Sequence, residues 1–104
     1  VALHRAIEHC QRLGVLKTIP LIGEVAAISC GLYKGEAVLD LDYDEDSNAE
    51  ADANFVLTGK GGIVEIQGTA EADPFSEETF MELMSLAKKG VSELTVAQNA
   101  ALGL

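Results

Sequence analysis

Basic residues are scarce in this sequence, and their scarcity excludes several kinds of function. Seven of the 104 residues are Lys or Arg, against seventeen Asp and Glu, so the formal charge is −10. Proteins that hold nucleic acid or an anionic membrane by electrostatics alone do so through clustered Lys and Arg. The composition therefore argues against electrostatic binding of nucleic acid or an anionic membrane by this chain alone. It leaves open that the acidic residues bind a cation.

Cysteine and long apolar runs are rare as well. Cys10 and Cys30 form no C-x-x-C pair, so they make neither a zinc site nor a disulfide framework, and each falls on a predicted apolar position. The longest weakly polar stretch, PLIGEVAAISCGLY, is interrupted by Glu24 and by glycines. It falls short of the roughly 20 apolar residues that a membrane helix requires. We therefore expect no membrane contact and a reducing, cytoplasmic setting.

Helical periodicity marks both ends of the chain. Residues 1–14 carry apolar side chains at helical spacing, and no capping residue precedes them, so we expect a helix entered part-way along, as in an excised domain. Gly14 is placed to end it. Near the other end, Ser76 is placed to cap a helix over residues 76–102, and Gly90 interrupts that helix without ending its apolar stripe.

Four predicted strands lie between these helices. They are EVAAISCGLY (24–33), AVLDLDY (37–43), ANFVLT (53–58) and GIVEIQGTA (62–70). Tight turns, KGE and TGKGG, join the first pair and the last pair, which indicates antiparallel hairpins. We therefore predict a single α+β domain over residues 1–104, with a mainly antiparallel four-stranded sheet within residues 24–71 and helices packed on one of its faces.

The most unusual segment is LDLDYDEDSNAEAD, residues 39–52, which is acidic and has no nearby basic residue. Two like charges about 4 Å apart repel by roughly 1 kcal/mol even in water. The period-two alternation of residues 37–43 places Asp40 and Asp42 on one strand face, and Asp46 can fold back to join them. Either these charges point apart into solvent, or a cation lies among them.

A calcium loop of the EF-hand kind does not fit this segment. Asp40, Asp42 and Asp44 occupy the first, third and fifth positions of such a loop, but Glu45 replaces the required glycine and Ala51 replaces the bidentate glutamate. A magnesium site remains, because Mg²⁺ takes one or two carboxylates and fills its shell with water and substrate phosphate. The alternative, a solvated acidic turn, also stays open at this point.

The segment from Val38 to Ser76, which contains DLDY, ED and QGTAE in that order, resembles the C-terminal half of the bacterial ribonuclease PH family. The preceding strand and the terminal helix fit the same family. These proteins are phosphate-dependent 3′ to 5′ exoribonucleases that trim transfer RNA precursors. The resemblance implies RNA with a single-stranded 3′ end as substrate, inorganic phosphate as co-substrate, nucleoside diphosphates as products, and assembly into a hexameric ring of dimers.

The resemblance also implies roles for particular residues. The family's D-x-D-x-x-x-D pattern falls here on Asp40, Asp42 and Asp46, which are the expected catalytic residues, with Asp40 and Asp46 holding Mg²⁺ and one of the three assisting proton transfer. The family's phosphate-binding arginine and Gly-Thr-Arg turn have no counterpart in this chain. The second interpretation is therefore a non-catalytic assembly module that lacks the phosphate-binding residues.

Overall fold

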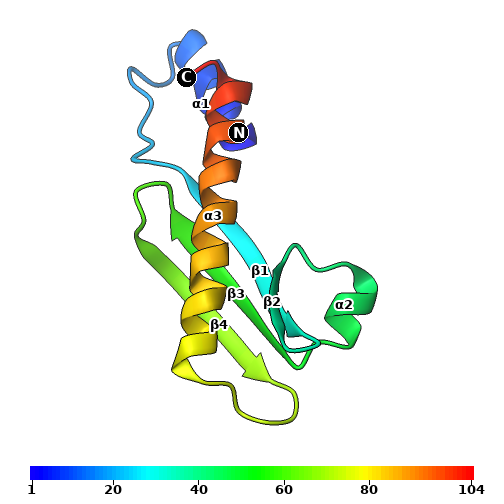
Figure 1. The fold of residues 1–104 in the computed structure, drawn as a ribbon. Coiled ribbons are helices and arrows are strands. Elements are labelled where there is room, and N and C mark those ends of the chain that lie inside the picture. Colours follow the sequence, from blue (N-terminus) through cyan, green and yellow to red (C-terminus); the bar gives the residue numbers. More distant parts are fainter.

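An antiparallel sheet forms the centre of the computed structural model, which describes residues 1–104 (Figure 1). Its strands are β1 (Val25–Tyr33), β2 (Glu36–Leu39), β3 (Ala51–Thr58) and β4 (Ile63–Ala70). The spatial order is β2-β1-β3-β4, with every neighbouring pair antiparallel. The predicted fold class, a four-stranded antiparallel sheet in an α+β domain, is confirmed.

The two predicted hairpin turns also form. Between β1 and β2, Lys34 and Gly35 both have positive φ, 50° and 78°, which is the backbone twist that joins two antiparallel strands most directly. Between β3 and β4, Gly61 has a φ of 87°, and the Gly62 N–H donates to Thr58 Oγ1 at 2.8 Å. Glycine supplies the left-handed conformation in each turn at little steric cost.

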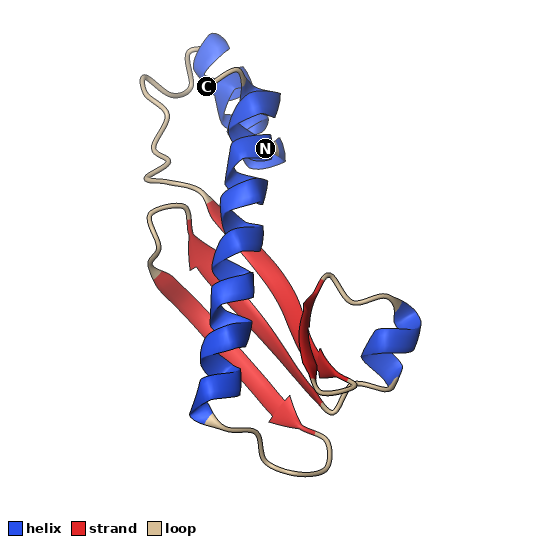
Figure 2. Cartoon of the chain, in the orientation of Figure 1, coloured by secondary structure: helices blue, strands red, loops and turns tan.

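One long helix, α3 (Glu77–Leu102), runs across the sheet (Figure 2). Ser76 caps its start, because Ser76 Oγ accepts a hydrogen bond from the Thr79 N–H at 3.1 Å. The helix passes through Gly90 without a break and ends at Gly103, whose φ is 74°. The prediction of a continuous C-terminal helix over residues 76–102 is thus confirmed.

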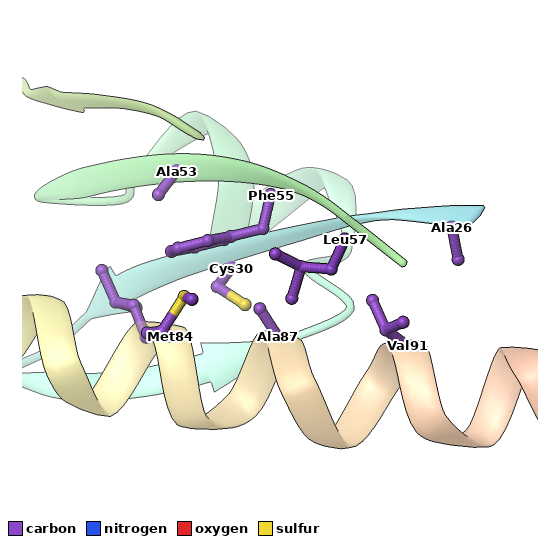
Figure 3. Close-up of a cluster of buried hydrophobic side chains, with 9 residues drawn as sticks. Ala26, Cys30, Ala53, Phe55, Leu57, Met84, Ala87 and Val91 are labelled. Atoms are coloured by element: carbon purple, nitrogen blue, oxygen red, sulfur yellow. The ribbon is translucent and has the colours of Figure 1, made fainter. Parts of the chain in front are cut away.

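The hydrophobic core lies between α3 and one face of the sheet (Figure 3). Alternate residues of β3 point into it, which follows from the period of two along a strand. Phe55 and Leu57 from β3 meet Leu83 and Ala87 from α3, and all four are almost completely buried.

The first helix, α1 (Ala2–Arg12), lies at the end of α3 and not over the sheet (Figure 1). It buries none of its residues, and its link to the C-terminal end of α3 is a hydrogen bond of 2.8 Å from Arg5 Nη2 to the Ala101 carbonyl. Gly14 follows it with a φ of 77°, as expected for a residue that ends a helix. No helix in the chain combines the length and apolarity needed to cross a membrane.

The prediction for residues 37–43 is wrong in its second half. The strand β2 ends at Leu39, and a short helix, α2 (Tyr43–Ser47), replaces the expected continuation. Asp40 and Asp42 therefore do not share a strand face. The physical reason is local: Asp42 Oδ1 accepts a hydrogen bond from the Glu45 N–H, and this contact starts a helical turn.

Candidate functional site

The acidic segment leaves the sheet at Asp40. This residue has a φ of 59°, in the left-handed region that Asp tolerates better than most residues other than glycine. Its N–H donates to the Ser29 carbonyl at 3.4 Å, so its backbone is still attached to β1 while the chain turns away. The Asp40 side chain is exposed. The end of β2 thus holds this carboxylate at the edge of the sheet.

Asp42 is the N-cap of α2. Its Oδ1 accepts a hydrogen bond from the Glu45 N–H at 2.8 Å, and Glu45 Oε1 accepts one from the Asp42 N–H at 3.1 Å. This reciprocal pair is a capping box. Two acids of the segment are therefore used in starting a helix, and acids in the first turn of α2 also suit the helix dipole.

Asp46 lies one turn further along α2, and Asp40 lies before it. Both side chains are exposed, and neither carboxylate takes part in a hydrogen bond or ion pair within the chain. No three His, Cys, Asp or Glu side chains are grouped so that they could hold a metal ion. The three predicted aspartates thus do not form one cluster, and Asp40 and Asp46 are the two carboxylates that remain unused.

This donor set is compatible with Mg²⁺. The ion is commonly bound by one or two carboxylates, with water and substrate phosphate completing its octahedral shell. Asp40 and Asp46 supply hard oxygen ligands and form no ion pair within the chain. A site of this kind needs no third protein ligand.

A hollow opens beside Asp40, between the end of β2 and the middle of α3. Its lining residues are Ala27, Ile28, Ser29, Leu39, Asp40, Leu41, Gly90, Glu93 and Leu94. Glu93 supplies the second carboxylate of this hollow, over a mainly apolar floor. Glu93 could not be singled out from the sequence, since an exposed glutamate on a helix carries no signal of its own and only the packing of α3 brings it near Asp40.

Comparison with known proteins decides the family. Residues 23–90 match the profile described as the 3′ exoribonuclease family, domain 2. The chain belongs to this exoribonuclease family. The match covers the sheet, the acidic segment and the first half of α3, and it confirms the resemblance that the acidic segment indicated.

Two relatives in this family are similar over nearly the whole chain. Ribonuclease PH of Rhodospirillum rubrum is 62% identical over 102 residues, which are 98% of this chain and 42% of that protein. Ribonuclease PH of Methylorubrum populi is 57% identical over 102 residues, which are 98% of this chain and 43% of that protein. The chain thus spans about two fifths of the length of the curated relatives it matches.

A solved structure shows the same fold. The crystal structure of rice (Oryza sativa) Rrp46 superposes with a TM-score of 0.54 at 23% identity, covering 73% of this chain and 37% of that one. At this identity the likeness concerns the fold alone.

Proposed function

We propose that this chain supplies the acidic part of the active site of a phosphorolytic 3′ to 5′ exoribonuclease. The observation that supports this most directly is that Asp40 and Asp46, both exposed and without side-chain partners, lie in a segment that matches the exoribonuclease family. The substrate is RNA with a single-stranded 3′ end, transfer RNA precursors included. Inorganic phosphate attacks the last phosphodiester, and a nucleoside diphosphate leaves.

Asp40 and Asp46 are the residues that would hold Mg²⁺, which when bound supplies positive charge against the oxygens of the reacting phosphoryl group. Phosphoryl transfer depends mainly on positioning and charge neutralisation, so two carboxylates on an anchored backbone suit this task. The backbone contact between Asp40 and Ser29 anchors the first residue, and α2 anchors the second.

Asp42 takes a positioning role in this proposal. Its Oδ1 is occupied by the Glu45 N–H, and this bond holds the start of α2, on which Asp46 lies one turn later. We therefore assign direct contact with metal and substrate to Asp40 and Asp46. Asp42 sets the distance between them, because without its cap the short helix loses its main local support.

The phosphate co-substrate requires positive charge that this chain does not place near the acids. Its two arginines, Arg5 and Arg12, lie on α1, at the end of α3 remote from the acidic segment (Figure 1). We propose that the phosphate-binding residues belong to the remaining length of the protein or to a neighbouring subunit, in a hexameric ring of dimers. This observation also favours a second candidate: by itself the 104-residue chain folds and assembles without catalysing a reaction.

Activity is tested on the chain extended to the length of its relatives, with single-stranded RNA, Mg²⁺ and inorganic phosphate. We expect nucleoside diphosphates in amounts that depend on phosphate, and a loss of at least about 100-fold in kcat for Asp46→Asn, as is typical when charge stabilisation is removed. Asp44→Asn is the matched control, because it removes a neighbouring charge from the same helix. Nucleoside monophosphates formed without phosphate would contradict the proposal.

Metal binding is tested separately on the 104-residue chain by titration calorimetry with Mg²⁺. Asp40→Asn and Asp46→Asn should each weaken binding at least about tenfold, whereas Asp44→Asn should leave it within about twofold. Equal effects of all three substitutions would mean that the ion is attracted by the net charge of the segment, and the specific site would be refuted.

A further inference from the structure

The strand β1 has a free edge along its first half (Figure 1). β2 pairs with β1 only from Cys30 to Tyr33, and at Asp40 the chain turns away from β1. β3 pairs with the other side of β1. Residues 25–29 therefore have no strand beside them on the β2 side, and their outward N–H and C=O groups are open to a ligand or to another strand.

Two hydrogen bonds show which residues of β1 point their backbone groups to this free edge. On the β3 side, the Gly59 N–H donates to the Glu24 carbonyl at 3.1 Å. On the β2 side, the Asp40 N–H donates to the Ser29 carbonyl at 3.4 Å. Backbone groups alternate between the two sides of a strand, so the N–H and C=O of Ala27 point to the same side as those of Ser29. Neither group of Ala27 has a partner in the chain.

Both ends of the free edge are blocked, which favours a small ligand over a strand. At one end, Gln98 Nε2 donates to the Val25 carbonyl at 3.0 Å. At the other end, the Ser29 carbonyl already accepts from Asp40. The gap between them is centred on Ala27, whereas strands in proteins usually have at least about three residues. A planar ligand that needs one donor and one acceptor fits this gap better than a strand does.

The hollow beside Asp40 lies against this part of the edge, because Ala27 is among its lining residues. Its volume is about 470 Å³, and pockets for small ligands occupy roughly 300 to 1,000 Å³. Leu41 and Leu94 give it apolar walls, and Glu93 gives it a carboxylate. A donor, an acceptor and an anionic group thus surround an apolar space.

A nucleobase matches this combination of groups. It is a flat ring that carries a donor and an acceptor side by side on its Watson–Crick edge. In adenine and cytosine a ring nitrogen accepts and the exocyclic amino group donates, whereas in guanine and uracil a ring N–H donates and a carbonyl oxygen accepts. The N–H and C=O of Ala27 can pair with either arrangement, because they supply one donor and one acceptor.

Glu93 adds a preference among the bases, because a carboxylate only accepts hydrogen bonds. Adenine, cytosine and guanine each carry an exocyclic amino group, which has an N–H to donate to this carboxylate. Uracil has no amino group, and a carbonyl oxygen would face the carboxylate instead. Glu93 therefore favours three of the bases over uracil.

We propose that this hollow binds the 3′-terminal base of an RNA substrate, with Ala27 bound to the edge of the base and Glu93 selecting against uracil. The choice of RNA as ligand rests on the proposed function, in which Asp40 holds Mg²⁺ near the scissile phosphate. That phosphate and the terminal base belong to the same nucleotide, so their sites must adjoin. Asp40 lines the hollow and meets this requirement.

The first experiment titrates the 104-residue chain with adenosine or uridine and follows its amide resonances by NMR. We expect saturable shifts at Ala27 and Ser29, with a dissociation constant of about 1 mM for adenosine. Uridine should bind about tenfold more weakly, as for the loss of a hydrogen bond to a charged group. Neither nucleoside needs Mg²⁺, phosphate or turnover. Absence of these shifts would therefore refute the base site and leave the proposed function standing.

Substitutions on α3 test the two kinds of contact in the same titration. Glu93→Gln should bring adenosine and uridine within about twofold of each other, because the glutamine amide can accept from an amino group or donate to a carbonyl. Glu82→Gln, an exposed position outside the hollow, makes the same change in charge and should keep the preference. Leu94→Ala should weaken both nucleosides, whereas Val96→Ala should weaken neither. Equal effects within either pair of variants would contradict the proposal.

The chain extended to the length of its relatives tests whether RNA uses the site. The ratio of kcat/KM for RNA ending in adenosine to RNA ending in uridine should be about ten, and Glu93→Gln should reduce it to about two or less. A merely structural role of Glu93 would lower both values and keep their ratio. Hydrogen exchange of the Ala27 amide should be fast in this protein and slowed by adenosine. Slow exchange without a ligand would mean that a strand from the remaining length covers the edge, and the proposal would be overturned.

Discussion

Gly90 offers a sharp test of how α3 packs against the sheet. A Cβ built at this position would lie 2.8 Å from Ile28 Cδ1, 3.2 Å from Ile28 Cγ1 and 3.4 Å from Leu39 Cδ1. The first distance is shorter than real Cβ contacts, so Gly90→Ala forces Ile28 to move. Ile28 is packed against the core, which limits where it can go. Glycine is thus required by close approach of the helix, although it is a poor helix former.

Two opposing effects determine how Gly90→Ala changes the free energy of unfolding. Replacing glycine by alanine inside a helix favours folding by about 1 kcal/mol. Adding a methyl group at a close contact costs about 1 to 3 kcal/mol in a filled core, and the hollow beside Ile28 places Gly90 near the lower end of that range. We therefore expect Gly90→Ala to lower the free energy of unfolding by up to about 1 kcal/mol, measured by urea denaturation. Ser92→Ala, at an exposed position of the same helix, should change it by less than about 0.5 kcal/mol.

A double-mutant cycle identifies the cause. Ile28→Val removes the Cδ1 atom that the new methyl would meet, and alone it should cost about 0.5 to 1.5 kcal/mol. Combined with Gly90→Ala, it should cost less than the sum of the two, with a coupling of about 1 kcal/mol or more. The reasoning is refuted if the two effects add, or if Gly90→Ala stabilises the protein by the full helix-propensity gain.

Three further predictions concern single side chains. Asp42→Ala should destabilise the chain by about 1 kcal/mol and weaken Mg²⁺ binding, whereas Asp42→Asn, which can still accept from the Glu45 N–H, should retain both; equal losses would contradict the capping role. Asp40→Gly should raise the free energy of unfolding by up to about 1 kcal/mol, because φ is 59° there, and should abolish Mg²⁺ binding, as calorimetry and urea denaturation of one variant would show. Burial raises the pKa of the Cys30 thiol from its ordinary 9.0 to about 11, so the fold favours the neutral thiol; the free energy of unfolding should fall as pH rises from 9 towards 11, and Cys30→Ala should remove that slope. A thiol reagent at pH 8 should accordingly label Cys10 and leave Cys30 unreacted until the protein unfolds.

The arrangement of the fold could be predicted because several independent signals agree. The small and β-branched residues of 24–33, the KGE turn and the cap at Ser76 each define one element, and each is found where the sequence placed it. Glycine is a poor helix former, so Gly90 could have ended the final helix. The apolar stripe on both sides of it indicated that the helix continues. Packing against β1 and β2 then explains why glycine is present.

The sequence indicates candidate site residues by their type, and it did not predict their geometry. Residues 37–43 alternate as a strand should, yet the same letters contain Asp42 followed three residues later by Glu45, which is the signature of a capping box. Two patterns compete in this segment, and the local hydrogen bonds of the cap prevail because β2 lies at the edge of the sheet, with a neighbour on one side only. Recognising the box would have placed α2 and separated Asp42 from Asp40.

The fold itself accounts for several of the acids in the segment from Asp40 to Asp52. Asp42 and Glu45 cap α2, and Glu50 Oε1 accepts from the Gly35 N–H at 3.1 Å, which ties the segment back to the β1–β2 turn. Asp40 and Asp46 are different, because their carboxylates have no partner, and the Asp40 backbone also occupies a conformation that glycine would adopt with less strain. Residues in sparsely populated backbone conformations cluster at functional sites. We therefore assign Asp42, Glu45 and Glu50 to the fold and propose a cation site for Asp40 and Asp46 alone.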